Sequence, residues 1–223
     1  RAPVASSTFE AAALDLERAG LRGLEHPHLV RILDAGTSGE QLFVVTELVP
    51  GGSLAARRLP LPAAWQTAVA EQMLEALAYL HGHGILHGDV KPENILVAAE
   101  APPAFKLADF GLAQRRVAAE AGLARGSPAF MAPEIIRGDP ADERSDLYAL
   151  GVTLYEVVFG ELPFATEDVR EVLLRHLTET PRRLASPGDV EPRLVALLRR
   201  LLAKEPAARP AEARAALALW RGE

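Results

Sequence analysis

The 223-residue chain contains no cysteine. It therefore holds no disulfide framework, no thiol nucleophile and no zinc site built from thiolates. Its net charge of −6 argues against a nucleic-acid-binding surface, because such a surface needs a basic stripe that displaces counterions. Long apolar runs are also missing, since the rich stretch 149–159 is interrupted by Glu156 and falls short of the ~20 residues of a membrane span. We expect a cytoplasmic protein with no membrane segment and no nucleic-acid partner.

What is present is the composition of an ordinary globular chain, with 49% apolar and 24% charged residues. Neither an internal repeat nor a long linker divides it, and the pattern predicts a mostly helical body with a β fringe on its N-terminal side. Val69, Met73 and Leu77, for example, share one face of a long helix, and Ser53 is placed to cap a short one. The expected elements are helices over 8–24, 62–80, 144–159, 167–178, 191–203 and 210–220, strands over 29–33, 42–46, 95–97 and 105–108, and an ordered loop over 111–133.

The most informative segment, 85–96, carries polar residues whose types suit phosphoryl transfer. Asp89 is a carboxylate that can accept a hydroxyl proton, Lys91 is a cation for the transferring phosphate, and Asn94 offers an oxygen to magnesium. Fifteen residues after Asn94, the triplet 109–111 (Asp-Phe-Gly) places a second carboxylate at the end of a short strand, where its glycine permits an unusual turn.

These motifs are followed by Gly-Ser-Pro-Ala-Phe-Met-Ala-Pro-Glu over 126–134. In order and spacing, the set resembles the catalytic domain of Ser/Thr protein kinases over essentially the whole chain. The resemblance implies an α+β, mostly α, protein-kinase-like fold, with a truncated small lobe over 1–49 (one helix, two strands and the start of the hinge) and a complete helical large lobe over 50–223. It also implies an enzyme that uses ATP and Mg²⁺ to phosphorylate Ser or Thr of protein substrates.

The resemblance assigns roles to individual residues. Asp89 would orient the substrate hydroxyl and take its proton, and Lys91 would steady the γ-phosphate. Ser127 would bond to both, which favours Ser/Thr over Tyr specificity. Asn94 and Asp109 would hold magnesium. The positions implied at the nucleotide site are Thr46 as gatekeeper, Glu47 and Val49 with backbone groups for adenine, Ser53 just after the hinge, Leu96 beneath the ring, and Glu17 as the helix glutamate that pairs with the ATP-binding lysine.

Other positions are implied to support the site rather than to act in it. Glu134 would form a buried pair with Arg209, and Asp146 would begin a buried helix. Four side chains would stack as a spine through the two lobes. They are Leu21, Ile32, His87 and Phe110.

The chain also departs from the kinase pattern. No Gly-x-Gly-x-x-Gly loop and no Val-Ala-Ile-Lys lysine lie upstream of Glu17. Three strands with their turns need at least ~25 residues, but only sixteen precede Glu17. We therefore expect that the chain begins after the third strand of the small lobe, as a fragment whose nucleotide site lacks its roof. A naturally truncated pseudokinase that acts as a scaffold is the alternative.

Two further departures concern regulation. Gly88 stands where most relatives carry the arginine that receives an activation-loop phosphate, and residues 112–126 include no serine, threonine or tyrosine. We predict activity that does not depend on phosphorylation within 112–126.

A metal site and a small-molecule kinase are the two less favoured interpretations. His81, His83 and His87 lie close together, but the glycines between them remove the rigid helical spacing of metal motifs, so His87 is predicted to be buried and bonded to backbone. A small-molecule kinase is disfavoured by the segment 126–134, which resembles a peptide-binding element.

Overall fold

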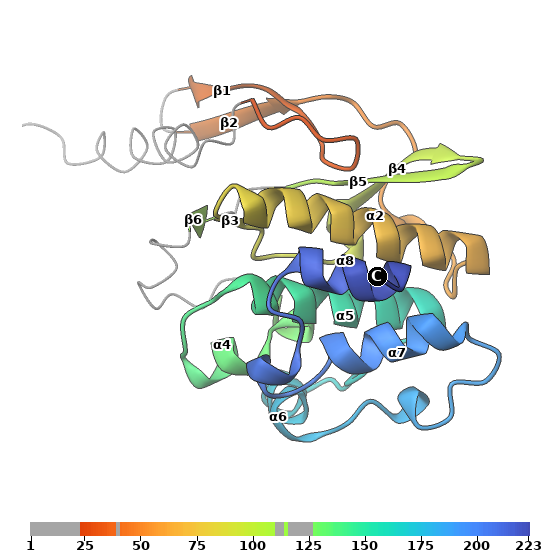
Figure 1. Ribbon diagram of the computed structural model, residues 1–223. Coiled ribbons are helices and arrows are strands. Elements are labelled where there is room, and N and C mark those ends of the chain that lie inside the picture. The colour runs from red at the N-terminus through yellow and green to blue at the C-terminus, as the bar shows by residue number, and fades with distance from the viewer. Residues whose placement is uncertain (1–22, 39–40, 110–113, 116–126) are drawn as a thin grey trace, which may run out of the picture.

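The computed structural model describes residues 23–38, 41–109, 114–115 and 127–223, and in these ranges the helices gather beneath a set of short strands (Figure 1). The mostly helical prediction is confirmed. The helix predicted over 8–24, with Glu17 and Leu21, lies outside the described residues, as does Phe110. The helices are α2 (Ala63–Gly82), α4 (Pro133–Arg137), α5 (Glu143–Phe159), α6 (Val169–Thr178), α7 (Pro192–Leu201) and α8 (Ala213–Arg221).

The helix boundaries follow the sequence pattern closely, with one exception. Helix α4 was not predicted, because its five residues are too few to show a helical period. It begins at Pro133, where a missing N–H does no harm, and ends at Arg137, just before Gly138, which adopts the left-handed conformation. Among the residues that the structure describes, none of the helices is both long and apolar enough to cross a membrane.

Within the described residues, the strands pair antiparallel in three two-stranded sheets, two of which are hairpins, and the first of these corrects a prediction. The strands are β1 (Ile32–Ser38) with β2 (Gln41–Thr46), β3 (Ile85–Leu86) with β6 (Gln114–Arg115), and β4 (Ile95–Glu100) with β5 (Pro103–Leu107). The strand predicted over 29–33 instead runs from Ile32, opposite Thr46, to Ser38, opposite Gln41. The polar second half of β1 has the composition of a turn. It is a strand because it pairs with β2, and local composition does not report such a tertiary contact.

Leu29 and Val30, predicted to be in the first strand, instead join the two hairpins. The Val30 N–H donates to the Leu107 carbonyl at 2.9 Å, and the Leu107 N–H donates to the His28 carbonyl at 2.9 Å. The stretch before β1 is therefore anchored on β5, next to the residues that lead to Asp109.

The segment between β2 and α2 lies directly on β4. The Gly51 N–H donates to the Val97 carbonyl at 3.2 Å, and the Val97 N–H donates to the Gly52 carbonyl at 2.8 Å. A Cβ at Gly51 would lie 2.3 Å from the Val97 carbonyl oxygen, so only glycine allows this approach. Ser53 precedes the short 3₁₀ turn η1 (Leu54–Ala56) as predicted, but its side chain makes no capping hydrogen bond, which corrects that part of the prediction.

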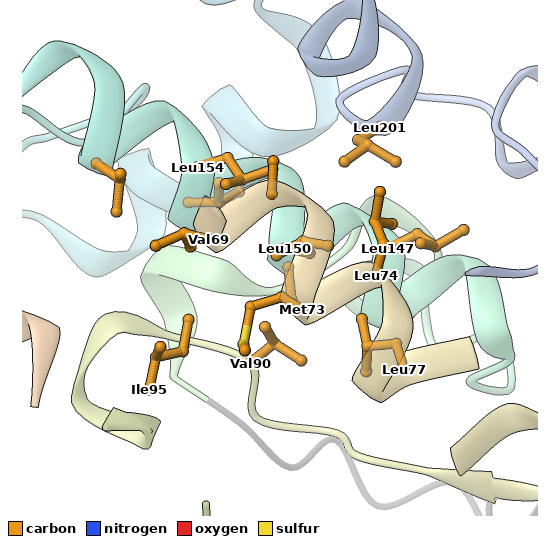
Figure 2. Packing of buried hydrophobic residues seen from close by; sticks show 14 of the residues in the cluster. Val69, Met73, Leu74, Leu77, Val90, Ile95, Leu147, Leu150, Leu154 and Leu201 are labelled. Atoms are coloured by element: carbon orange, nitrogen blue, oxygen red, sulfur yellow. The ribbon is translucent and has the colours of Figure 1, made fainter. Parts of the chain in front are cut away.

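The core lies between α2 and α5. Figure 2 shows Met73, Leu74 and Leu77 of α2 close to Leu147 and Leu150 of α5, in one cluster of fully buried side chains. The same cluster takes in Val90 and Ile95, one on each side of Asn94. Burying a side chain of this size contributes roughly 1.5–3 kcal/mol. The loop that carries the candidate catalytic residues is thus fixed by its own apolar neighbours.

Candidate active site

A buried carboxylate of α5 holds the backbone that leads to Asp89. Asp146, 3% exposed, accepts hydrogen bonds from the N–H groups of His87 and Gly88, both at 2.8 Å, and from Nε2 of His81 at 3.1 Å. Burial by itself raises the pKa of Asp146, but the bond and charge of His81 and the other contacts outweigh it, and the net pKa is lowered. Asp146 is therefore charged, and it fixes two consecutive peptide units.

His87 connects this loop to the strand that precedes Asp109. The ring is fully buried, its Nε2 lies 3.0 Å from the Ala108 carbonyl, and its Nδ1 accepts from the Asp89 N–H at 3.2 Å. The carbonyl can only accept, so Nε2 carries the proton. Burial lowers the pKa of His87 and keeps the ring neutral. The prediction of a buried, backbone-bonded histidine is confirmed.

Gly88 occupies a conformation that strongly favours glycine, with φ at +78°. The left-handed region costs other L-residues about 1–2 kcal/mol. We predict that Gly88→Ala lowers the free energy of unfolding by about that amount, measured by equilibrium denaturation. Gly82→Ala is the matched control, because Gly82 ends α2 with open space around it and without a positive φ. Equal effects of the two substitutions would contradict the role of backbone strain at Gly88.

Asp89, Lys91 and Ser127, the three predicted catalytic residues, are brought together by the fold. Asp89 is 8% exposed, and its Oδ2 lies 2.5 Å from Nζ of Lys91. That ammonium also donates to Oγ of Ser127 at 2.9 Å, and the Ser127 hydroxyl lies 3.4 Å from Oδ1 of Asp89. The carboxylate, ammonium and hydroxyl therefore form a closed polar triangle, although Ser127 is distant in sequence.

Asn94 joins this cluster through its amide nitrogen. Nδ2 donates to the Asp89 carbonyl at 2.8 Å and to Oδ2 of Asp89 at 3.1 Å, and the Asn94 carbonyl accepts from the Ala108 N–H at 2.8 Å. The next residue is Asp109, exposed and at φ +61°, a conformation unusual for a residue other than glycine. The loop and the start of the Asp-Phe-Gly triplet are therefore adjacent.

Asn94 and Asp109 fit a magnesium site of a particular kind. The Asn94 nitrogen makes both side-chain bonds to Asp89, so the amide oxygen remains as a ligand atom, and Asp109 adds a carboxylate. Within the described ranges, no three His, Cys, Asp or Glu side chains cluster as a complete metal cage. Magnesium is commonly held by one or two protein oxygens together with substrate phosphates and water, so this donor set fits magnesium bound with ATP.

The predicted nucleotide-site positions lie at the end of β2, in the segment that follows it, and in β4. Thr46 is exposed at the end of β2, and Val49 is 9% exposed just beyond it. Ser53 forms an isolated antiparallel bridge with Leu96, so these two predicted positions lie side by side. Glu17 is outside the described residues.

Glu47 is held by partners away from the catalytic cluster. Its carboxylate pairs with Lys106 at 2.5 Å and accepts from the Arg31 N–H at 2.8 Å, and the bond to Lys106 is the main reason why the pKa of Glu47 is lowered. Its N–H donates to the Arg31 carbonyl at 3.0 Å, which leaves the Glu47 carbonyl as its group for a nucleotide. Sequence reasoning missed Lys106, because no local pattern reports an ion pair between β5 and the residue that follows β2.

The predicted pair of Glu134 and Arg209 is confirmed. Nη1 and Nη2 of Arg209 lie 2.7 Å and 2.8 Å from the two carboxylate oxygens, and the Ser145 hydroxyl donates to Oε1 of Glu134 at 2.8 Å. Burial acts to raise the pKa of Glu134, but the hydrogen bonds and charge of Arg209 prevail and the pKa is lowered. The pair ties the start of α4 to the loop between α7 and α8.

The sequence is similar to a family model and to several named proteins. The family model described as "Protein kinase domain" matches residues 5–220. The chain is 38% identical over 208 residues to the serine/threonine-protein kinase pkn3 of Myxococcus xanthus, covering 86% of this chain and 38% of that protein. It is 37% identical over 191 residues to the serine/threonine-protein kinase ULK3 of Xenopus laevis, covering 83% and 41%.

A third relative is the serine/threonine-protein kinase PknL of Mycobacterium tuberculosis, which is 37% identical over 205 residues, or 89% of this chain and 51% of that protein. The matched part of the chain thus corresponds to between 38% and 51% of the length of these three relatives.

Proposed function

Because the chain belongs to the protein kinase family, we propose that the protein transfers the γ-phosphate of ATP to serine or threonine hydroxyls of protein substrates. The observation that carries this proposal is the cluster of Asp89, Lys91 and Ser127, in which one carboxylate, one ammonium and one hydroxyl meet within hydrogen-bonding distance. Phosphoryl transfer requires positioning and charge compensation more than covalent chemistry, and these three groups supply both.

In the proposed reaction, Asp89 accepts the proton of the substrate hydroxyl. The hydroxyl oxygen forms a bond to the γ-phosphorus, the bond from that phosphorus to the β–γ bridging oxygen breaks, and ADP leaves. Lys91 compensates the negative charge near the transferring group, and its bond to Ser127 holds the ammonium at Asp89. Magnesium, when bound by Asn94 and Asp109, would neutralise phosphate charge.

The nucleotide would bind where the segment after β2 meets β4. We assign the Glu47 carbonyl and the backbone of Val49 to adenine, Leu96 to the face of the ring, and Thr46 and Ser53 to its edges. In this scheme, residues 1–49 belong to the small lobe and residues 50–223 to the large lobe, and Glu17 has the role of the helix glutamate that pairs with the ATP-binding lysine of the family.

The test is MgATP-dependent phosphorylation of peptide libraries that carry serine, threonine or tyrosine as the only acceptor, using the full-length protein. We expect phosphoserine and phosphothreonine without phosphotyrosine, and loss of transfer when EDTA removes the metal. Phosphotyrosine as the main product, or ATP binding without transfer to any library, would contradict the proposal.

A further inference from the structure

The segment that follows Ser127 is held in place by a buried histidine of α6. Ser127 leads into the 3₁₀ turn η4 (Pro128–Phe130), which packs on α5 and α6. His176 of α6 is fully buried, and its Nε2 lies 3.0 Å from the Ala129 carbonyl. The stretch is therefore held at two points, because Ser127 bonds to Lys91 and Ala129 bonds to α6.

The hydrogen bonds around His176 have one consistent direction. The Ala129 carbonyl can only accept, so Nε2 of His176 is the donor. In the neutral ring Nδ1 then accepts from the Tyr148 hydroxyl at 2.9 Å. The oxygen of Tyr148 in turn accepts from Nζ of Lys204 at 3.4 Å. A chain of donors thus runs from Lys204 through Tyr148 and His176 to the backbone of η4.

The surroundings keep His176 and Tyr148 each in one protonation state near pH 7. Burial, reinforced by the charge of Lys204, lowers the pKa of His176 to about 4, so the ring is neutral near pH 7. Burial also raises the pKa of Tyr148 well above its ordinary value, which keeps the phenol protonated. Phe164 packs edge-on against the imidazole at 4.8 Å and fixes its plane. The N–H at Nε2 of His176 is therefore fixed toward the Ala129 carbonyl.

A buried polar side chain is a poor choice if space-filling is all that is required, because leucine would fill the site without desolvating two nitrogens. What the imidazole adds is direction, since it bonds to one carbonyl and so selects one conformation of η4. Ala129 lies two residues from Ser127, whose hydroxyl contacts Lys91 and Asp89.

We propose that His176 is a positioning residue for the protein substrate, which holds η4 in the conformation that lets a substrate hydroxyl reach Asp89. This inference rests on the proposed kinase function. It predicts that loss of the bond to Ala129 weakens the use of peptide substrate while the nucleotide site is unaffected.

The first test compares three variants of the full-length protein. His176→Leu removes both bonds, His176→Gln keeps a donor and an acceptor, and Val172→Ala is the matched control, because Val172 is buried in the same helix. We expect His176→Leu to raise the KM for peptide roughly 5- to 10-fold, the range of one lost hydrogen bond, with the KM for ATP unchanged. His176→Gln should recover most of the loss, and Val172→Ala should leave the KM for peptide unchanged.

The second test does not depend on phosphoryl transfer. Amide hydrogen exchange in a peptide covering 127–133 should be faster in His176→Leu than in the wild type and in Val172→Ala. Should His176→Leu fail to fold, Tyr148→Phe removes the donor to Nδ1 while it keeps the aromatic ring, and it should show the same changes to a smaller extent.

The two proposals fail in different ways. An active wild type whose His176→Leu variant shows unchanged exchange over 127–133, or whose KM for peptide rises no more than in Val172→Ala, overturns the role of His176 alone. A wild type that binds ATP but transfers no phosphate overturns the kinase function, and with it the substrate role of His176, whatever the exchange rates are.

Discussion

Replacing Asp89 by asparagine is expected to lower kcat by about 10²- to 10⁴-fold, the range that a positioned general base contributes. The amide is close in shape to the carboxylate and can still accept one bond from Lys91 or Asn94, so the loop should stay in place. What is lost is the ability to take the hydroxyl proton. The measurement is steady-state phosphorylation of a serine peptide at saturating ATP, with the KM for ATP determined in parallel.

The control for Asp89→Asn is Asp139→Asn, which removes the charge of an exposed carboxylate in the loop after α4. It should leave kcat unchanged. A residual kcat of Asp89→Asn within a few-fold of the wild type would show that this carboxylate does not act as the base. A matching fall in the melting temperature would assign the loss to unfolding instead.

Replacing Arg209 by alanine is expected to lower the free energy of unfolding by about 3–5 kcal/mol, because it leaves a buried carboxylate without its partner. The Arg209 side chain is 0% exposed and that of Glu134 is 6% exposed. The guanidinium also donates to the carbonyls of Ala203 at 2.8 Å, Arg144 at 2.9 Å and Lys204 at 3.1 Å, and all three bonds would be lost. Small domains have only about 5–15 kcal/mol in total, so the change is severe.

Equilibrium denaturation measures the effect of Arg209→Ala, and Arg209→Lys is the milder variant, since it keeps the charge but loses the bidentate geometry. The matched control is Arg137→Ala, which breaks an exposed pair with Glu205 at 3.3 Å and should cost at most about 1 kcal/mol. Comparable losses for Arg209→Ala and Arg137→Ala would contradict the importance of burial.

The effect of Arg209→Ala should also depend on pH with a definite sign. The pKa of Glu134 is lowered from its ordinary value of 4.5 in the folded protein, so the pair contributes fully above that pH and its contribution is lost as acid protonates the carboxylate. The difference in stability between wild type and Arg209→Ala should therefore shrink below pH 4.5.

Much of the fold was predictable because the long helices are continuous segments rich in apolar residues, which the sequence shows directly. The boundaries of α2 and α5 were predicted within two residues at each end, and the strands β4 and β5 were placed correctly, although shorter than they are. The errors lie where local signal is weak. Helix α4 is too short to show a period, and the polar half of β1 forms a strand because β2 lies beside it.

Some residues of the candidate site could likewise be predicted from the sequence, and others could not. Asp89, Lys91 and Asn94 are close in sequence and could be singled out together, and the Asp-Phe-Gly triplet added Asp109. Three further supporting contacts could not be found in this way. His81, Lys106 and His176 act on groups far along the chain, and nothing in their neighbourhoods marks them.

By itself, the sequence determined which chemical groups are available and in what order, because motif letters and apolar periods are properties of the chain. The tertiary structure decided which of these groups meet and in what state. Asp146 is ionised because it receives backbone N–H groups and a histidine inside the core, and His176 is neutral because burial and Lys204 oppose its protonation. Charge state and bond direction depend on neighbours that only folding brings within a few ångströms, because desolvation and hydrogen bonding act at that range.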